Sequence, residues 1–191
     1  MGFIADFGFS GELFRHLRVR WCVYAIIISW FSMVNSAMAE EKIVMELESG
    51  TVEIETLPAL APKHVARIKE LVAEGFYDGV VFHRVIPGFM AQTGDPTGTG
   101  SGGSGQKLDG EFSRQSHVRG TVSMARTSNP NSADSQFFIV YDEASHLDGQ
   151  YTVWGQVSSG MEHIEAIPGG TGGNGRVVDE PVKIIRMSLS E

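Results

Sequence analysis

The amino-acid sequence predicts a mainly β protein, folded as a closed antiparallel β-barrel of eight strands with two helices. Glycine is frequent, at 23 of 191 residues against roughly 7 % in average proteins, which indicates many tight turns. The apolar residues recur in short runs of alternating polarity, as in half-buried strands. Two segments carry helical spacing, and they do not alternate with strands as in a parallel α/β fold.

The first predicted elements form a β-hairpin. Polar and apolar residues alternate over Lys42–Glu48 and again over Thr51–Thr56, with Ser49 and Gly50 between them as a two-residue turn. Short runs separated by turn residues predict the remaining strands at Val80–Ile86, Phe89–Thr93, Gly120–Met124, Gln136–Val140, Thr152–Val157 and Val182–Leu189.

The two predicted helices differ in length. The longer covers Ala61–Glu74, with Pro62 in its first turn and Gly75 at its end, where these residues are favoured. Its apolar residues share one face, namely Val65, Ile68, Leu71 and Val72. A short second helix is predicted over Met161–Ala166.

Residues 1–39 match the pattern of a secretory signal peptide. Three arginines precede an apolar run over Trp21–Val34, and small residues at Ala37 and Ala39 form a cleavage site. We therefore predict a cut after Ala39, which releases a mature domain of residues 40–191 into the bacterial periplasm.

The length of the stretch before the apolar run keeps other interpretations open. It holds twenty residues and includes Phe3, Phe7 and Phe9, so either translation starts downstream or the segment stays uncleaved as an anchor. The apolar run of about 14 residues is shorter than the ~20 that span a membrane. Contact with a membrane is therefore expected only if the segment stays uncleaved.

Charge and cysteine content narrow the classes of function. The net charge is -8, which argues against the cationic face that nucleic acid requires. Cys22 is the only cysteine and lies in the predicted signal segment, so the mature domain can form no internal disulfide. No two of the six histidines are spaced as a helical zinc pair, so we expect no structural metal. We also expect the protein to be a monomer.

Two glycine-rich segments resemble nucleotide-binding loops only in their spacing. Gly100–Gly105 and Gly170–Gly175 both match G-x-G-x-x-G, but neither is followed by a predicted helix, so both are interpreted as flexible loops. No serine lies in a G-x-S-x-G motif, so a hydrolase has no support beyond composition.

The segment Phe82–Asp95 carries the first chemical signal, because Arg84 lies among apolar residues. Such an arginine either pairs with a carboxylate at a strand edge or faces a cleft. Three further segments follow: Ser123–Arg126, Asn129–Ile139 and His146–Gly155. Together their F-H-R-V-I-P-G-F-M-x-Q-x-G-D, S-Q-F-F-I and L-D-G patterns resemble the cyclophilin family, over nearly all of residues 42–191.

The resemblance implies a peptidyl-prolyl cis/trans isomerase that acts on proline-containing peptides and unfolded exported proteins, and so assists their folding. It implies that Arg84 is the catalytic residue and that no metal or cofactor takes part. Other matched positions imply substrate contacts: Phe89, Met90, Phe138 and Leu147 in a proline pocket, Gln92 and Gln136 as polar contacts, Ala125 and Arg126 along the groove, and His146 and Tyr151 at its edge. Phe137, adjacent to Phe138, is expected in the core because neighbouring strand residues face opposite sides.

An arginine suits this reaction. Rotation about an Xaa-Pro bond is slow because the amide has partial double-bond character, with a barrier of ~18–20 kcal/mol. In the twisted transition state the prolyl nitrogen regains its lone pair and can accept a hydrogen bond. A fixed, permanently charged donor then stabilises the twisted state more than either planar state.

This sequence departs from the family pattern at three positions. His146 stands where cyclosporin-sensitive members carry tryptophan, so we expect weak cyclosporin binding with intact activity. Tyr151 replaces a common histidine, and its ring can still close the proline pocket. Arg126 replaces a common asparagine, which predicts an altered peptide preference. The competing interpretation is a non-catalytic peptide-binding module or chaperone on the same scaffold, since a fold alone does not determine activity.

Overall fold

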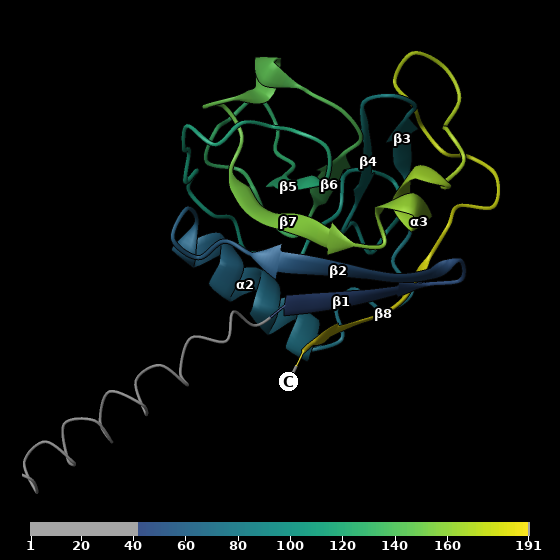
Figure 1. Ribbon diagram of the computed structural model, residues 1–191, viewed down its shortest axis with the longest axis horizontal. Coiled ribbons are helices and arrows are strands. Elements are labelled where there is room, and N and C mark those ends of the chain that lie inside the picture. The colour runs from purple at the N-terminus through teal and green to yellow at the C-terminus, as the bar shows by residue number, and fades with distance from the viewer. Residues whose placement is uncertain (1–41, 191) are drawn as a thin grey trace, which may run out of the picture. The chain divides into compact units, whose positions relative to one another are not determined.

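Eight antiparallel strands form one curved sheet in the computed structural model, which describes residues 42–190 (Figure 1). The predicted signal segment lies outside the described residues. Across the sheet the strand order is β3-β4-β6-β5-β7-β2-β1-β8. In chain order the elements are β1 (Lys42–Leu47), β2 (Gly50–Thr56), α2 (Pro62–Ala73), β3 (Arg84–Ile86), β4 (Met90–Thr93), β5 (Thr121–Met124), β6 (Phe137–Val140), the 3₁₀ helix η1 (Ser145–Leu147), β7 (Val153–Ser159), α3 (Met161–Glu165) and β8 (Ile184–Leu189).

The sheet is an open half-barrel, and the predicted closed barrel was wrong. Strand pairing stops at β3 and β8. The strand β3 covers only the last three residues of the predicted Val80–Ile86, and β8 begins at Ile184 instead of Val182. Between these edges lie an isolated bridge from Val81 to Lys183 and single backbone hydrogen bonds, such as Phe82 N–H to Val182 O. Glycine-rich and irregular backbone over residues 169–183 replaces the missing ladder.

The first hairpin turns one residue earlier than predicted. Leu47 pairs directly with Gly50, so Glu48 and Ser49 form the turn and Gly50 begins β2. Gly50 has a φ of 146°, and a side chain there would collide with the His163 ring. The glycine is therefore required both by its backbone angle and by close packing against α3.

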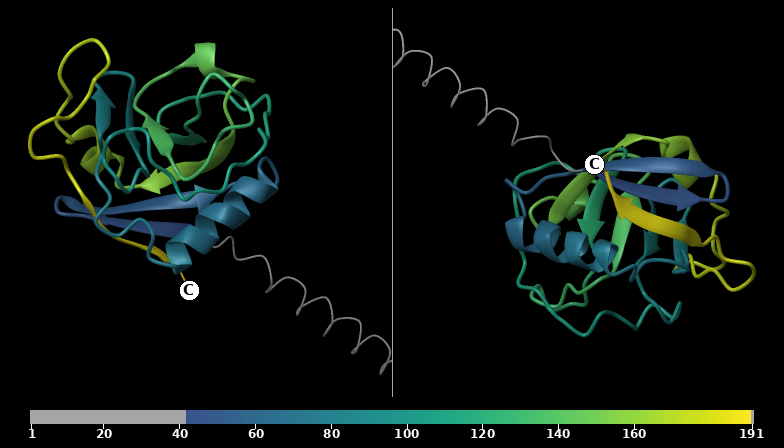
Figure 2. Two further views of the ribbon diagram at one scale, coloured as in Figure 1. Left: turned by 180° about the vertical axis from the view of Figure 1, so that it is seen from behind. Right: turned by 90° about the horizontal axis from the view of Figure 1, so that it is seen from below.

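The helix α2 closes one end of the core. Its apolar face is the predicted one: Val65, Ile68, Leu71 and Val72 are buried in the same cluster as the inward side chains of the sheet. Figures 1 and 2 show α2 and α3 lying apart on the sheet. No helix within residues 42–190 is long and apolar enough to cross a membrane.

A carboxylate from a distant loop caps the start of α2. No side chain of the preceding Ala61 caps the helix. The Glu111 carboxylate instead accepts hydrogen bonds from the backbone N–H groups of Lys63 and His64, and it lies 2.7 Å from His64 Nδ1. Helix starts favour such negative groups, so this contact ties α2 to the loop before β5.

Candidate active site

A row of cross-strand neighbours places the important side chains on one face of the sheet. Arg84 on β3 pairs with Gln92 on β4, Gln92 with Phe138 on β6, and Phe138 with Ser123 on β5. Directly opposed residues project from the same face. The alternation sends Phe137 into the main core instead, where it is fully buried.

A cavity of about 310 Å³ lies on this face. It brings together ten of the eleven site residues predicted from the sequence: Arg84, Phe89, Met90, Gln92, Ala125, Arg126, Phe138, His146, Leu147 and Tyr151. The eleventh, Gln136, lines an adjoining cavity of about 520 Å³, which shares Gln92, Ala125 and Arg126 with the first.

Three polar residues, Arg84, Gln92 and Gln136, form what we call the polar rim. Gln136 Nε2 donates to the carbonyls of Gly100 at 3.1 Å and Gly102 at 2.8 Å, so its Oε1 faces Gln92. Gln92 Nε2 donates to that oxygen at 2.9 Å, and Gln92 Oε1 accepts from Arg84 Nη1 at 3.1 Å. The backbone of the glycine-rich loop therefore sets the orientation of both amides and of the guanidinium.

A second contact on Arg84 was missed by sequence reasoning. Arg84 Nε donates to the backbone carbonyl of Asn174 at 2.8 Å. Residues 170–175, interpreted from sequence as a flexible loop, are tied to β3 because Val85 N–H donates to Gly175 O and Gly170 N–H donates to Val85 O. Any residue type has a backbone carbonyl, so the identity of residue 174 does not predict this hydrogen bond. The only feature of the segment that stood out in the sequence was the spacing of its glycines.

Five apolar and aromatic residues, Phe89, Met90, Phe138, Leu147 and Tyr151, form what we call the apolar floor. Met90, Phe138 and Leu147 are buried in a cluster separate from the main core, and Phe89 and Tyr151 pack against it. The Phe138 and Tyr151 rings meet edge to face, with centroids 5.6 Å apart. The floor therefore presents aromatic and aliphatic side chains, already packed against one another, to the cavity.

The edge of the cavity carries the residues that depart from the family pattern. Arg126 places its guanidinium carbon 4.5 Å from the Tyr151 ring centroid and donates from Nε and Nη2 to Gln150 O. The His146 ring lies 5.4 Å from the Phe89 ring. Arg126 thus holds Tyr151 by a cation–π contact and also lines the adjoining cavity.

Two carboxylates organise the glycine-rich loop that supports the rim. Asp95 accepts hydrogen bonds from the N–H groups of Thr97, Gly100 and Gly102, while Asp134 accepts from Ser104. Burial raises the pKa of the Asp95 carboxyl, but the bonds from Thr97, Gly102 and Gly100 outweigh it and hold that pKa well below its ordinary value. The loop is therefore fastened to the sheet by charged acceptors.

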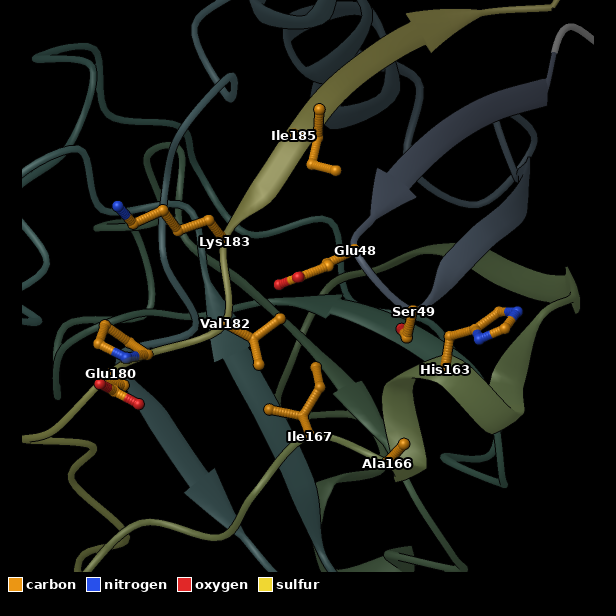
Figure 3. Close-up of a pocket in the computed structure, with 10 residues that line it drawn as sticks. Glu48, Ser49, His163, Ala166, Ile167, Glu180, Val182, Lys183 and Ile185 are labelled. Atoms are coloured by element: carbon orange, nitrogen blue, oxygen red, sulfur yellow. The ribbon is translucent and has the colours of Figure 1, made fainter.

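A larger depression, of about 810 Å³, lies elsewhere, at the β1–β2 turn, α3 and the start of β8 (Figure 3). Ile167, Val182 and Ile185 contribute its apolar wall, and Glu48 points into it. It shares no lining residue with the Arg84 cavity. Within residues 42–190 no group of three or more histidine, cysteine, aspartate or glutamate side chains could hold a metal ion.

Comparisons with known proteins place the half-barrel, with its arginine fixed beside a partly apolar cavity, in a class of isomerase. The family model described as cyclophilin type peptidyl-prolyl cis-trans isomerase/CLD matches residues 42–189. A probable peptidyl-prolyl cis-trans isomerase of Brucella abortus is 48 % identical over 177 residues, which cover 86 % of this chain and 90 % of that one. Isomerase B of Bacillus subtilis is 46 % identical over 127 residues, covering 65 % and 88 %.

Solved structures show the same fold. A cyclophilin type isomerase of Cryptosporidium parvum, crystallised in the presence of the dipeptide Ala-Pro, aligns with a TM-score of 0.71 at 31 % identity. The alignment covers 78 % of this chain and 99 % of that one. The chain belongs to the cyclophilin family, and it is a peptidyl-prolyl cis-trans isomerase.

Proposed function

We propose that Arg84 is the catalytic residue of this isomerase and that the apolar floor binds the substrate proline. The observation that carries the proposal is the fixed guanidinium beside the cavity. Its Nε is held by Asn174 O and its Nη1 by Gln92 Oε1, which leaves other N–H groups for a peptide. A donor fixed in advance needs no reorganisation when the amide twists.

The chemistry needs no bond to break. The pyrrolidine ring sits against Phe138 and Leu147, while Arg84 donates to the prolyl nitrogen as its lone pair becomes available. Gln92 holds the carbonyl on the side that rotates. The floor binds planar and twisted states alike, so it supplies affinity, whereas the arginine supplies the rate.

Proline-containing peptides are the substrate class that fits this cavity. Its volume of about 310 Å³ and the edge-to-face rings suit a small apolar ring, and a structural relative was crystallised in the presence of Ala-Pro. NMR exchange of an Ala-Pro peptide with the full-length chain and with Arg84→Ala tests the assignment. We expect the variant to lose at least ~100-fold, about 2.7 kcal/mol of transition-state stabilisation. If neither protein speeds exchange, the fold acts as a peptide-binding module.

We also propose that the enzyme is exported and assists the folding of periplasmic proteins. The support is the sequence pattern of residues 1–39, with arginines, a short apolar run and small residues at Ala37 and Ala39. N-terminal sequencing of the protein from fractionated bacterial cells tests this. A periplasmic chain that begins at Glu40 is expected, and a cytoplasmic chain with an intact N-terminus would rule the proposal out.

A further inference from the structure

A buried histidine beneath the cavity connects three of the segments that build it. His117 Nδ1 lies 2.9 Å from Asp148 Oδ1, and His117 Nε2 lies 2.9 Å from Ser123 Oγ. A carboxylate only accepts, so Nδ1 carries the hydrogen, and Nε2 then accepts from the serine hydroxyl. The same order of Asp, His and Ser occurs in hydrolytic triads.

Burial excludes a hydrolytic role for this chain of hydrogen bonds. The side chains of His117 and Ser123 are each 0 % exposed, and the Phe138 ring stacks over the imidazole with centroids 6.3 Å apart and planes 16° apart. Because Ser123 is fully buried, its Oγ is not accessible to a substrate carbonyl. The arrangement therefore has to act through its neighbours rather than on a substrate.

The histidine holds the turn that carries Leu147. Its backbone N–H donates to Asp148 Oδ1 at 2.8 Å, and its carbonyl accepts from Ala144 N–H at 2.8 Å. These contacts hold both ends of η1, the short helix that places Leu147 in the apolar floor. Hydrogen bonds from His117 also lower the pKa of the Asp148 carboxyl, because they stabilise its ionised form.

We propose that His117 is a positioning residue for the proline pocket: one imidazole, bonded to Asp148 and Ser123 and stacked on Phe138, sets the spacing between the Leu147 turn and the Phe138 strand. The inference rests on the proposed function, because it takes the apolar floor as the proline site. The polar rim is anchored separately, through Asn174 and the glycine-rich loop. Loss of the His117 side chain should therefore weaken peptide binding and leave the exchange rate at saturating peptide nearly unchanged.

A second buried histidine offers a matched control. His64 on α2 is also 0 % exposed and also pairs with a carboxylate, Glu111, and neither residue lines the cavity. We would compare full-length parent, His117→Gln and His64→Gln, measuring unfolding temperature, peptide dissociation constant and exchange rate at saturating Ala-Pro peptide. We expect the dissociation constant to rise about 10-fold in His117→Gln alone, with the saturated rate within about 2-fold of the parent.

The outcomes distinguish a failure of the His117 inference from a failure of the proposed function. If both variants lose stability and neither changes peptide affinity, His117 is structural only and the inference is wrong. If the parent itself fails to bind or isomerise the peptide, the proposed function fails and the inference fails with it. If the parent is active and His117→Gln binds the peptide as tightly as the parent does, the inference about His117 is wrong and the proposed function stands.

A milder variant and a measurement on the parent cover the case in which His117→Gln does not fold. Ser123→Ala removes only the Nε2 partner, and we expect the peptide dissociation constant to rise about 3-fold. Imidazole ¹⁵N signals of the parent should show hydrogen on Nδ1 in the uncharged ring. Hydrogen on Nε2 instead, or unchanged affinity in Ser123→Ala, would overturn the inference.

Discussion

The polar rim and the apolar floor line the same cavity but are held in place by different forces. The rim is a chain of directional hydrogen bonds that runs from Gly100 and Gly102 through both glutamines to Arg84. The floor is held by packing, with Met90, Phe138 and Leu147 buried in a cluster of their own. Directional contacts can distinguish a twisted amide from a planar one, whereas apolar contact cannot.

The comparison leads us to expect that the rate of isomerisation and the affinity for peptide depend on different parts of the site. Changes in the rim should lower the rate at saturation, and changes in the floor should raise the peptide dissociation constant. Each variant below either separates the two quantities or shows that they are linked.

After the loss of at least ~100-fold expected for Arg84→Ala, the largest effect should come from Arg84→Lys, which keeps the charge but removes the planar guanidinium with its several N–H donors. An ammonium cannot bond to Asn174 O and Gln92 Oε1 while it also reaches the prolyl nitrogen. We expect the saturated exchange rate to fall about 30-fold with little change in affinity. Full activity in this variant would mean that charge alone suffices and that the hydrogen bonds of the rim are dispensable.

A smaller effect, on affinity, is expected from Phe138→Ala. The side chain is buried, so its loss should raise the peptide dissociation constant about 10-fold, or 1.4 kcal/mol, and lower stability by about 3–5 kcal/mol. Phe112→Ala is the control, because Phe112 is 42 % exposed and lines neither cavity of the site. A loss of rate at unchanged affinity in Phe138→Ala would contradict the assignment of affinity to the apolar floor and of rate to the polar rim.

Acid should loosen the rim through Asp95. Its folded-state pKa lies below the ordinary 3.8, so its contribution is complete above about pH 4 and is lost as the pH falls further. Denaturant unfolding from pH 6 to pH 2 should therefore show a steeper loss in the parent than in Asp95→Asn, by up to ~1.4 kcal/mol per pH unit. Parallel curves for the two proteins would show that Asp95 does not support the loop.

The smallest effects should come from the edge of the cavity. Arg126→Asn removes the contacts to Gln150 O and the Tyr151 ring, so peptide preference should shift about 2- to 3-fold without loss of the saturated rate. An unchanged preference profile would remove Arg126 from the specificity determinants. His146→Trp should strengthen cyclosporin binding, and low-nanomolar inhibition of the parent would contradict the weak binding expected here.

Most of the fold could be predicted from the sequence, because polar–apolar alternation in strands and the spacing of apolar residues in helices involve residues that are close in the chain. The apolar face of α2 and all eight strands were confirmed, but β3 and β8 are too short to close the barrel. That error reflects backbone pairing between residues far apart in sequence, which side-chain alternation over residues 80–86 does not report.

Site residues could be proposed from the sequence only where side chains form motifs. Ten of the eleven proposed residues line one cavity, and the register of β3, β4 and β6 aligns three of them, Arg84, Gln92 and Phe138. Asn174 acts through a backbone carbonyl, and His117 pairs with Asp148 and Ser123 from separate segments. Neither contact has a local sequence signal, so only the three-dimensional arrangement reveals it.

The most direct test measures both quantities in both parts of the site. NMR exchange of one Ala-Pro peptide, titrated against the full-length parent, Arg84→Ala and Phe138→Ala, gives each saturated rate and each dissociation constant. We predict that Arg84→Ala loses at least ~100-fold in rate with affinity within about 3-fold, and that Phe138→Ala loses about 10-fold in affinity with the saturated rate within about 3-fold. If Arg84→Ala keeps the parent's saturated rate and loses only affinity, the rim is a binding surface and Arg84 is not the catalytic residue.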